Sequence, residues 1–192
     1  VYAAFSDFTT GTAENTDVFL SRSLDGGATW QTPVRMNDDG AGGNAQFHPF
    51  MAVDQSTGDV IAAWHDARND VNNNAVDIYL ARSTDCGQTF EANIQVTKPS
   101  SEFNNSGISS SNLNTSDNPG ANANQAGEYL GLDVLNGTAY VAWTDTRHFF
   151  PSFTGESQKE NVGFATVSFG PTDLIFADGF ESSDTSAWTP IP

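Results

Sequence analysis

The fold is decided by a motif that the chain uses twice, SRSLDGGATW at residues 21–30 and ARSTDCGQTF at residues 81–90. Each copy has serine, aspartate, glycine, threonine and an aromatic residue at the same offsets, and the copies are 60 residues apart. A repeat at a fixed period indicates a structural unit that is stacked along the chain, because each unit needs its neighbours to bury its apolar faces. The first prediction is therefore architectural.

Short runs of β-branched and aromatic residues, bounded by Gly, Asn and Asp, recur along the chain, whereas helical periodicity is almost absent. This pattern predicts an all-β domain. Three runs, at residues 1–7, 60–68 and 139–147, share an apolar start, a small residue, an aromatic residue and an aspartate two positions later. Asn136 and Gly137 are the strongest hairpin signal, since both turn positions favour a positive φ.

Around these runs the sequence predicts four-stranded antiparallel meanders that pack as β-propeller blades. About three blades are expected, at residues 1–37, 48–97 and 129–170, with a polar insertion at 98–127 and a C-terminal tail at 171–192. An up-and-down barrel is the alternative, but the repetition of whole units favours blades. A closed propeller has ~4 to 8 blades, so we expect the remaining blades to come from an upstream fragment or another copy of the chain.

The charge balance argues against two classes of partner. The 192 residues carry 24 acidic and 7 basic side chains, a net charge of −17. Nucleic acids and anionic membranes bind clustered Lys and Arg, so neither is expected as a partner. No apolar run approaches the ~20 residues of a membrane span, and the single Cys86 cannot form an internal disulfide. We expect a secreted, extracellular or cell-surface protein whose sequence begins before Val1.

The repeated motif resembles the Asp-box, or BNR, repeat of the sialidase-like β-propellers, and the resemblance extends to about residue 169. It is carried by Ser23, Asp25, Gly27, Thr29 and Trp30 in the first copy and by Ser83, Asp85, Gly87, Thr89 and Phe90 in the second. The resemblance implies that the blades belong to a six-bladed sialidase-like propeller. It does not imply sialidase activity, because the same box occurs in non-catalytic glycan-binding propellers.

The motif itself is predicted to be structural. An aspartate that accepts hydrogen bonds from backbone N–H groups, a glycine at positive φ and a threonine hydroxyl together reverse the chain between the third and outer strands of a blade. Trp30 and Phe90 are expected to anchor the turn between sheets. Meander topology puts these turns at one end of the blades and the long connections at the other, where binding sites are normally built.

Candidate ligand-binding residues therefore come from the end with the long connections. Asp66 and Arg68 follow Trp64, and Asp145 and Arg147 follow Trp143, at the ends of equivalent strands. One interpretation is a buried tryptophan with an Asp–Arg pair that fixes the loop. The other is that the guanidinium groups bind a ligand carboxylate. His48, at the start of an inner strand, is a third candidate for lining a pocket.

The resemblance also implies an enzyme hypothesis. Sialidases of this fold use three arginines for the substrate carboxylate, a tyrosine nucleophile assisted by a glutamate, and an aspartate acid/base. Glu128 and Tyr129 are the candidate catalytic residues here, but they are neighbours on one predicted strand, so their side chains point to opposite sides. The Arg-containing Phe/Tyr-Arg-Ile/Leu-Pro landmark is absent from the sequence. Catalysis by this segment alone is therefore not predicted.

A calcium site competes for one long connection. Asp70, Asn72, Asn74 and Asp77 offer oxygen ligands at spaced positions in a loop, as hard cations require, although Asp and Asn are also common in loops simply because they turn well. No other cofactor is required.

The C-terminal DLIFADGFE stretch, residues 173–181, resembles the tail of secreted proteins of some gammaproteobacteria, and Leu174, Ile175 and Phe176 are a candidate edge strand. The sequence as a whole favours a secreted propeller module that binds a glycan or protein ligand or assembles at a surface. The alternatives are a fragment of an exo-α-sialidase or related glycoside hydrolase, and a structural protein that associates through its open blade edges.

Overall fold

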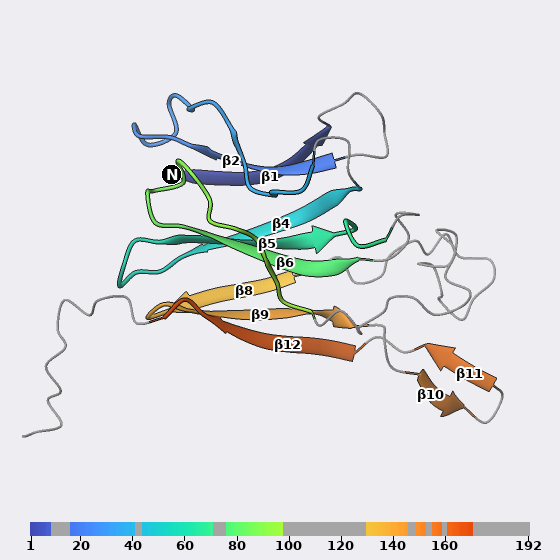
Figure 1. Cartoon of the computed structure of the whole chain (residues 1–192). Helices are drawn as coiled ribbons and strands as arrows, with labels where there is room; N and C mark the ends of the chain where they lie inside the picture. The colour runs from blue at the N-terminus through green and yellow to red at the C-terminus, as the bar shows by residue number, and fades with distance from the viewer. Residues whose placement is uncertain are drawn as a thin grey trace, which may run out of the picture.

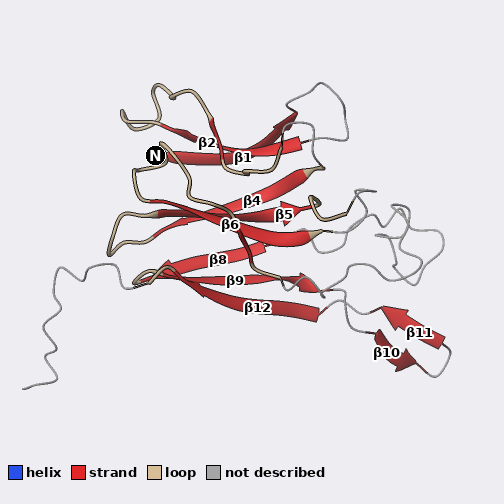
Figure 2. Cartoon of the chain, viewed as in Figure 1, coloured by secondary structure: helices blue, strands red, loops and turns tan. Residues whose placement is uncertain are grey.

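All regular secondary structure in the described part of the chain is β-strand, which confirms the all-β prediction (Figure 2). The computed structural model describes residues 1–8, 16–40, 44–70, 76–97, 130–145, 149–152, 155–158 and 161–170. Nothing in these ranges is a helix that could traverse a bilayer.

Three antiparallel meanders lie face to face, in the arrangement of consecutive propeller blades (Figure 1). Blade 1 consists of β1 (Tyr2–Phe8), β2 (Thr16–Arg22) and β3 (Val34–Arg35). Blade 2 consists of β4 (Gln46–Val53), β5 (Val60–Asp66), β6 (Asp77–Ser83) and β7 (Ile94–Gln95). Blade 3 consists of β8 (Leu130–Leu135), β9 (Thr138–Asp145) and β12 (Asn161–Ser168). A separate hairpin, β10 (Phe149–Ser152) with β11 (Gly155–Gln158), lies between β9 and β12 in the sequence.

The middle strand of blade 2 explains why the blades stack. All seven residues of β5 are buried, and successive side chains of a strand point to opposite faces. Ala62 and Trp64 therefore pack against blade 1, while Ile61 and Ala63 pack against blade 3. A strand that is apolar on both faces is stable only between two other layers.

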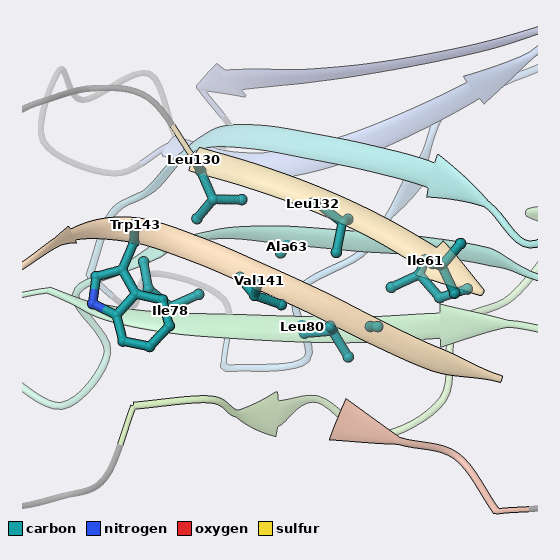
Figure 3. Packing of buried hydrophobic residues seen from close by; sticks show 10 residues of the cluster. Ile61, Ala63, Ile78, Leu80, Leu130, Leu132, Val141 and Trp143 are labelled. Carbon is teal, nitrogen blue, oxygen red and sulfur yellow. The ribbon is translucent and has the colours of Figure 1, made fainter. Parts of the chain in front are cut away.

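Two apolar cores fill the spaces between the blades. The first joins Val18, Leu20 and Met36 of blade 1 to Val60, Ala62, Trp64, Tyr79 and Ala81 of blade 2. The second joins Ile61, Ala63, Ile78 and Leu80 of blade 2 to Leu130, Leu132, Val134, Ala139, Val141 and Trp143 of blade 3, as Figure 3 shows. The two tryptophans occupy equivalent positions on the second strands of their blades. Trp64 of β5 pairs with Tyr79 of β6, and Trp143 of β9 pairs with Gly163 of β12.

The outward face of blade 3 carries exposed apolar side chains. Val162 is 81% exposed and Phe164 is 63% exposed. Strand register makes them equivalent to Ile78 and Leu80, which are fully buried at the junction of blades 2 and 3. Blade 3 covers Ile78 and Leu80, whereas no blade in the described part of the chain covers Val162 and Phe164.

The two repeated turns are built alike. Asp25 accepts hydrogen bonds from the Thr29 backbone N–H at 2.8 Å, the Thr29 hydroxyl at 2.6 Å and the Ser23 hydroxyl at 2.8 Å. Asp85 accepts the equivalent three bonds from Thr89 and Ser83. The bonds from Thr29, and then the one from Ser23, lower the pKa of Asp25 to about 2, because they stabilise the ionised carboxyl.

One expectation for these turns was half wrong. Phe90 packs against the core between blades 1 and 2, as predicted. Trp30, its counterpart, is 46% exposed and does not anchor its turn between sheets. The reason is position, since Trp30 belongs to blade 1 and no described residue forms a layer beyond that blade.

Short turns gather at one end of the stack, on the left in Figure 1. They include the two repeated turns and the β8–β9 hairpin, in which Asn136 and Gly137 both have positive φ, 50° and 71°. The carboxylate of Asp54, in the turn after β4, is fully buried and accepts the Gly137 N–H at 2.6 Å. This bond fixes blade 3 to blade 2 at the short-turn end.

A matched pair of glycine substitutions tests the contact between blades 1 and 2. Gly27 and Gly87 both have positive φ, but an added Cβ at Gly87 would collide with Leu20 Cδ2 of blade 1, whereas at Gly27 it would meet nothing within 4 Å. Gly27→Ala should lower the free energy of unfolding by about 1 kcal/mol through backbone strain. Gly87→Ala should lower it by about 2 to 3 kcal/mol, because overpacking adds to the strain. Equal losses in urea unfolding would contradict the inter-blade contact.

Candidate functional site

A buried carboxylate organises the opposite end of blade 2, where β5 finishes. Asp66 has no exposed surface, and its Oδ2 accepts hydrogen bonds from the Trp64 indole Nε1–H at 2.8 Å and from Arg68 Nε at 3.0 Å and Nη2 at 2.8 Å. This geometry explains the Trp-x-Asp-x-Arg pattern in blade 2. The tryptophan fills the space between blades, and the aspartate satisfies both the indole and the guanidinium group.

Arg68 extends this contact to blade 1. Its Nη1 donates to Asp38 Oδ1 at 2.6 Å, its Nη2 donates to Asn93 Oδ1 at 2.8 Å, and its guanidinium carbon lies 4.1 Å from the centre of the Tyr79 ring. Burial acts to lower the pKa of Arg68, but the hydrogen bonds that Arg68 donates to Asp66 and Asp38 outweigh it and raise that pKa. Arg68 therefore fixes two blades together.

These contacts argue against a ligand clamp at Asp66 and Arg68. Asp66 cannot contact a ligand because it is fully buried, and Asp145, its equivalent in blade 3, is only 3% exposed. The donors of Arg68 are used by the chain itself. Arg147 lies outside the described residues. The interpretation in which the Asp–Arg pair fixes the loop fits Asp66 and Arg68.

The other described arginines are also used within the chain. Arg35 bonds the Asp39 carbonyl oxygen at 2.7 Å, Arg82 forms a bidentate pair with Glu91 at 2.8 and 3.0 Å, and Arg22 donates to the Cys86 carbonyl oxygen at 3.4 Å. Across the described ranges, every arginine thus contacts an acceptor of the chain. A carboxylate-binding cluster of arginines is not formed by these residues.

A buried amide pair connects blade 1 to the first strand of blade 2. Asn37 Nδ2 donates to Asp17 Oδ1 at 2.6 Å and to Gln46 Oε1 at 2.9 Å. Gln46 Nε2 in turn lies 3.2 Å from Asp66 Oδ1. Buried amides stay in place only when their hydrogen bonds are satisfied. This network positions the start of β4, and no motif in the sequence indicates it.

The start of β4 contains a β-bulge. Phe47 pairs with His65 and Phe50 with Ala63, so three residue steps on β4 oppose two on β5. His48, inside the bulge, has a φ of 50°. Without the extra residue Phe47 and Phe50 would point to opposite faces. With it, both lie on the face of Ala63, which packs toward blade 3.

Two histidines and Phe47 form a ring cluster at this bulge. The Phe47 and His65 rings are stacked, 5.5 Å apart and 5° from parallel, and the His48 ring stands edge-on to both. His48 is exposed, as the prediction of a pocket-lining residue requires, whereas His65 is only 6% exposed. His65 Nδ1 is buried and has no hydrogen-bond partner among the described residues. Burial, and to a lesser extent His48, lowers the pKa of His65 to about 4.

Sequence reasoning found His48 and missed Phe47, Phe50 and His65. The signal was Pro49, because proline within a predicted strand marks an edge or a bulge. Read that way, the Phe-His-Pro-Phe stretch at 47–50 would have predicted an irregular strand start with two aromatic residues on one face.

The catalytic and metal predictions fall mainly on residues that the structure leaves undescribed. Glu128 and Tyr129 lie outside the described ranges, as do Asn72 and Asn74. Asp77 accepts bonds from the Thr97 hydroxyl at 2.7 Å and from Asn69 at 2.8 Å, and the backbone oxygen of Asp70 accepts one from Asn44. Within the described residues no three His, Cys, Asp or Glu side chains are grouped to hold a metal. The calcium site stays a prediction.

Known proteins resemble this chain. A sialidase of Bacteroides fragilis (strain YCH46) is 38% identical over 105 residues, in a match that covers 44% of this chain and 19% of that protein. The chain has sialidase relatives. Among solved structures, the Hadza microbial sialidase Hz136 matches 86% of this chain and 32% of its own, with 19% identity and a TM-score of 0.48. No family model matches.

The chain thus spans about a fifth of the length of the curated sialidase and about a third of the solved one. The activity and substrates of a whole sialidase are therefore proposals for this chain.

The buried His65 predicts a specific loss of stability in acid. An unfolded histidine titrates near pH 6.5, and His65 in the folded chain has a pKa of about 4. Between these values the unfolded state binds more protons, so the free energy of unfolding falls as the pH falls. Replacing the imidazole in His65→Phe should reduce the loss between pH 7.5 and pH 5 by about 2 kcal/mol. The same pH dependence in urea unfolding of both proteins would contradict this account.

Proposed function

We propose that this chain forms consecutive blades of a sialidase-type propeller and that the end of the blades opposite the short turns binds sialylated glycans. The observation that carries the proposal is the 38% identity to a sialidase over 105 residues. The blade architecture supports it, because the short, internally hydrogen-bonded turns occupy one end of the stack and the longer connections, where binding sites are normally built, lie at the other.

The described residues are assigned a binding role rather than the chemical step. In the family that the chain resembles, three arginines hold the substrate carboxylate, and the arginines of the described ranges are already engaged with Asp66, Glu91 and backbone oxygens. Glu128, Tyr129 and Arg147 remain catalytic or carboxylate-binding candidates outside those ranges. A complete hydrolytic site would need further blades, from an upstream fragment or from another copy.

The proposal includes a location outside the cell or at its surface. The net charge of −17 keeps such a domain soluble and away from anionic membranes. The reaction itself requires no cofactor, and calcium near Asp70 and Asp77 would serve stability.

A second candidate function is self-association through open blade faces. The observation in its favour is the exposure of Val162, Phe164 and Trp30, whose counterparts at the internal junctions are packed. Light scattering of the purified chain tests it: a dimer that becomes monomeric in Phe164→Asp supports assembly, and a monomeric wild type contradicts it.

Titration with a sialylated sugar tests the glycan proposal. We expect 3′-sialyllactose to bind the chain in calorimetry, and to bind more tightly than lactose, which has no sialyl group. Hydrolysis of a fluorogenic sialoside, measured in parallel, separates binding from catalysis, and we expect none from the chain alone. Absence of sialyllactose binding by a folded chain would contradict the proposal.

A further inference from the structure

The bulge at the start of β4 is the feature of the described chain that the fold does not explain. Its central residue, His48, is a non-glycine residue in the left-handed region, with a φ of 50°. Such a conformation costs about 1 to 2 kcal/mol for an ordinary residue, and bulges are frequent next to functional sites. The bulge also places two exposed rings side by side in the sequence, His48 and Phe50, separated only by Pro49.

We infer that Phe50 and His48 form a subsite for the ring of a neutral sugar, adjacent to the sialyl group of a bound glycan. This inference deepens the proposed function and rests on it for the identity of the ligand. The ring of Phe50 offers an apolar surface for the C–H face of a pyranose, and the imidazole of His48 offers a donor and an acceptor for its hydroxyls.

The exposure of Phe50 supports the subsite. Phe50 is 48% exposed although its strand neighbour Ala52 packs into the core between blades 2 and 3. The bulge turns Phe47 and Phe50 to the same face, and β8 of blade 3 lies beside β4 (Figure 1). An aromatic side chain left half in solvent gains its full burial energy only when a ligand covers it.

The histidine beneath the surface supports it independently. His65 is stacked on Phe47 and edge-on to His48, and its buried Nδ1 lacks a partner among the described residues. A buried polar atom without a hydrogen bond costs about 1 to 3 kcal/mol, so an apolar side chain would make a more stable core here. An unsatisfied buried polar group in a native fold calls for an explanation, and a functional role is one such explanation.

The charge of the surroundings decides the class of sugar. The arginines that the structure describes are engaged in contacts within the chain, and none of those contacts involves Phe47, His48, Phe50 or His65. The chain as a whole is strongly acidic. A carboxylate would gain little at Phe50, whereas a neutral pyranose needs only the apolar ring and hydroxyl partners. The subsite therefore fits the neutral sugar next to the sialic acid rather than the sialic acid itself.

Calorimetric titration of three variants with 3′-sialyllactose, lactose and free N-acetylneuraminic acid tests the subsite. Phe50→Ala should weaken binding of sialyllactose and of lactose about tenfold and leave the free acid unchanged, and Phe50→Tyr, which keeps the ring, should restore binding. Phe8→Ala removes another exposed phenylalanine, 55% exposed on β1, and should change nothing. Far-ultraviolet circular dichroism and thermal midpoints confirm that each variant is folded.

The outcomes separate this inference from the proposed function. If wild type binds sialyllactose and Phe50→Ala binds it as tightly as Phe8→Ala does, the subsite is wrong and the glycan proposal stands. If wild type binds lactose through Phe50 and gains nothing from the sialyl group, the subsite stands and sialoside recognition is wrong. If the folded wild type binds none of the three sugars, both are overturned.

Discussion

The Asp66 carboxylate is the interaction on which the arrangement of the blades depends. It is completely buried, and it accepts hydrogen bonds from Trp64, Arg68 and Gln46. Through the indole it holds the side chain that fills the junction of blades 1 and 2. Through Arg68 it reaches Asp38 and Asn93 beside the outer strands, and through Gln46 it reaches the first strand of blade 2. A buried charge remains in a fold only when its partners are fully arranged around it, so all of these elements are specified together.

The two ends of the stack have different physical roles. At the short-turn end, the bonds that Asp25 and Asp85 accept close two reversals of the chain, and the bond that Asp54 accepts from Gly137 joins two blades. At the other end, the Asp66 network is equally closed, but beside it the bulge contains the exposed His48 and Phe50, and the buried Nδ1 of His65 has no hydrogen-bond partner among the described residues. Hydrogen bonds fix the scaffold where the chain reverses. The exposed side chains of His48 and Phe50 lie at the other end, where longer connections leave the strands.

The architecture could be predicted from the sequence because the motif that specifies it occurs twice. The repeated Ser-x-Asp-x-Gly-x-Thr turn and the recurring strand runs indicate stacked meanders without any knowledge of side-chain contacts. The site could not be predicted in the same way. The role of Arg68 depends on Asp38 and Asn93, which lie 30 and 25 residues away, and the pairing of Phe47 with His65 depends on a register shift. Trp30 shows that a repeat alone does not predict burial. Its turn is built like that of Phe90, but the aromatic side chain stays exposed because no described layer packs against it.

The most direct test of the account is to locate the glycan-binding end by hydrogen–deuterium exchange of the backbone amides, with and without saturating 3′-sialyllactose. The account predicts added protection at the start of β4, around residues 46–50, and at the end of β5, with no change in the turns at residues 23–30 and 83–90. Protection confined to those turns, or to the outward face of blade 3, would contradict the division of the stack into a structural end and a binding end.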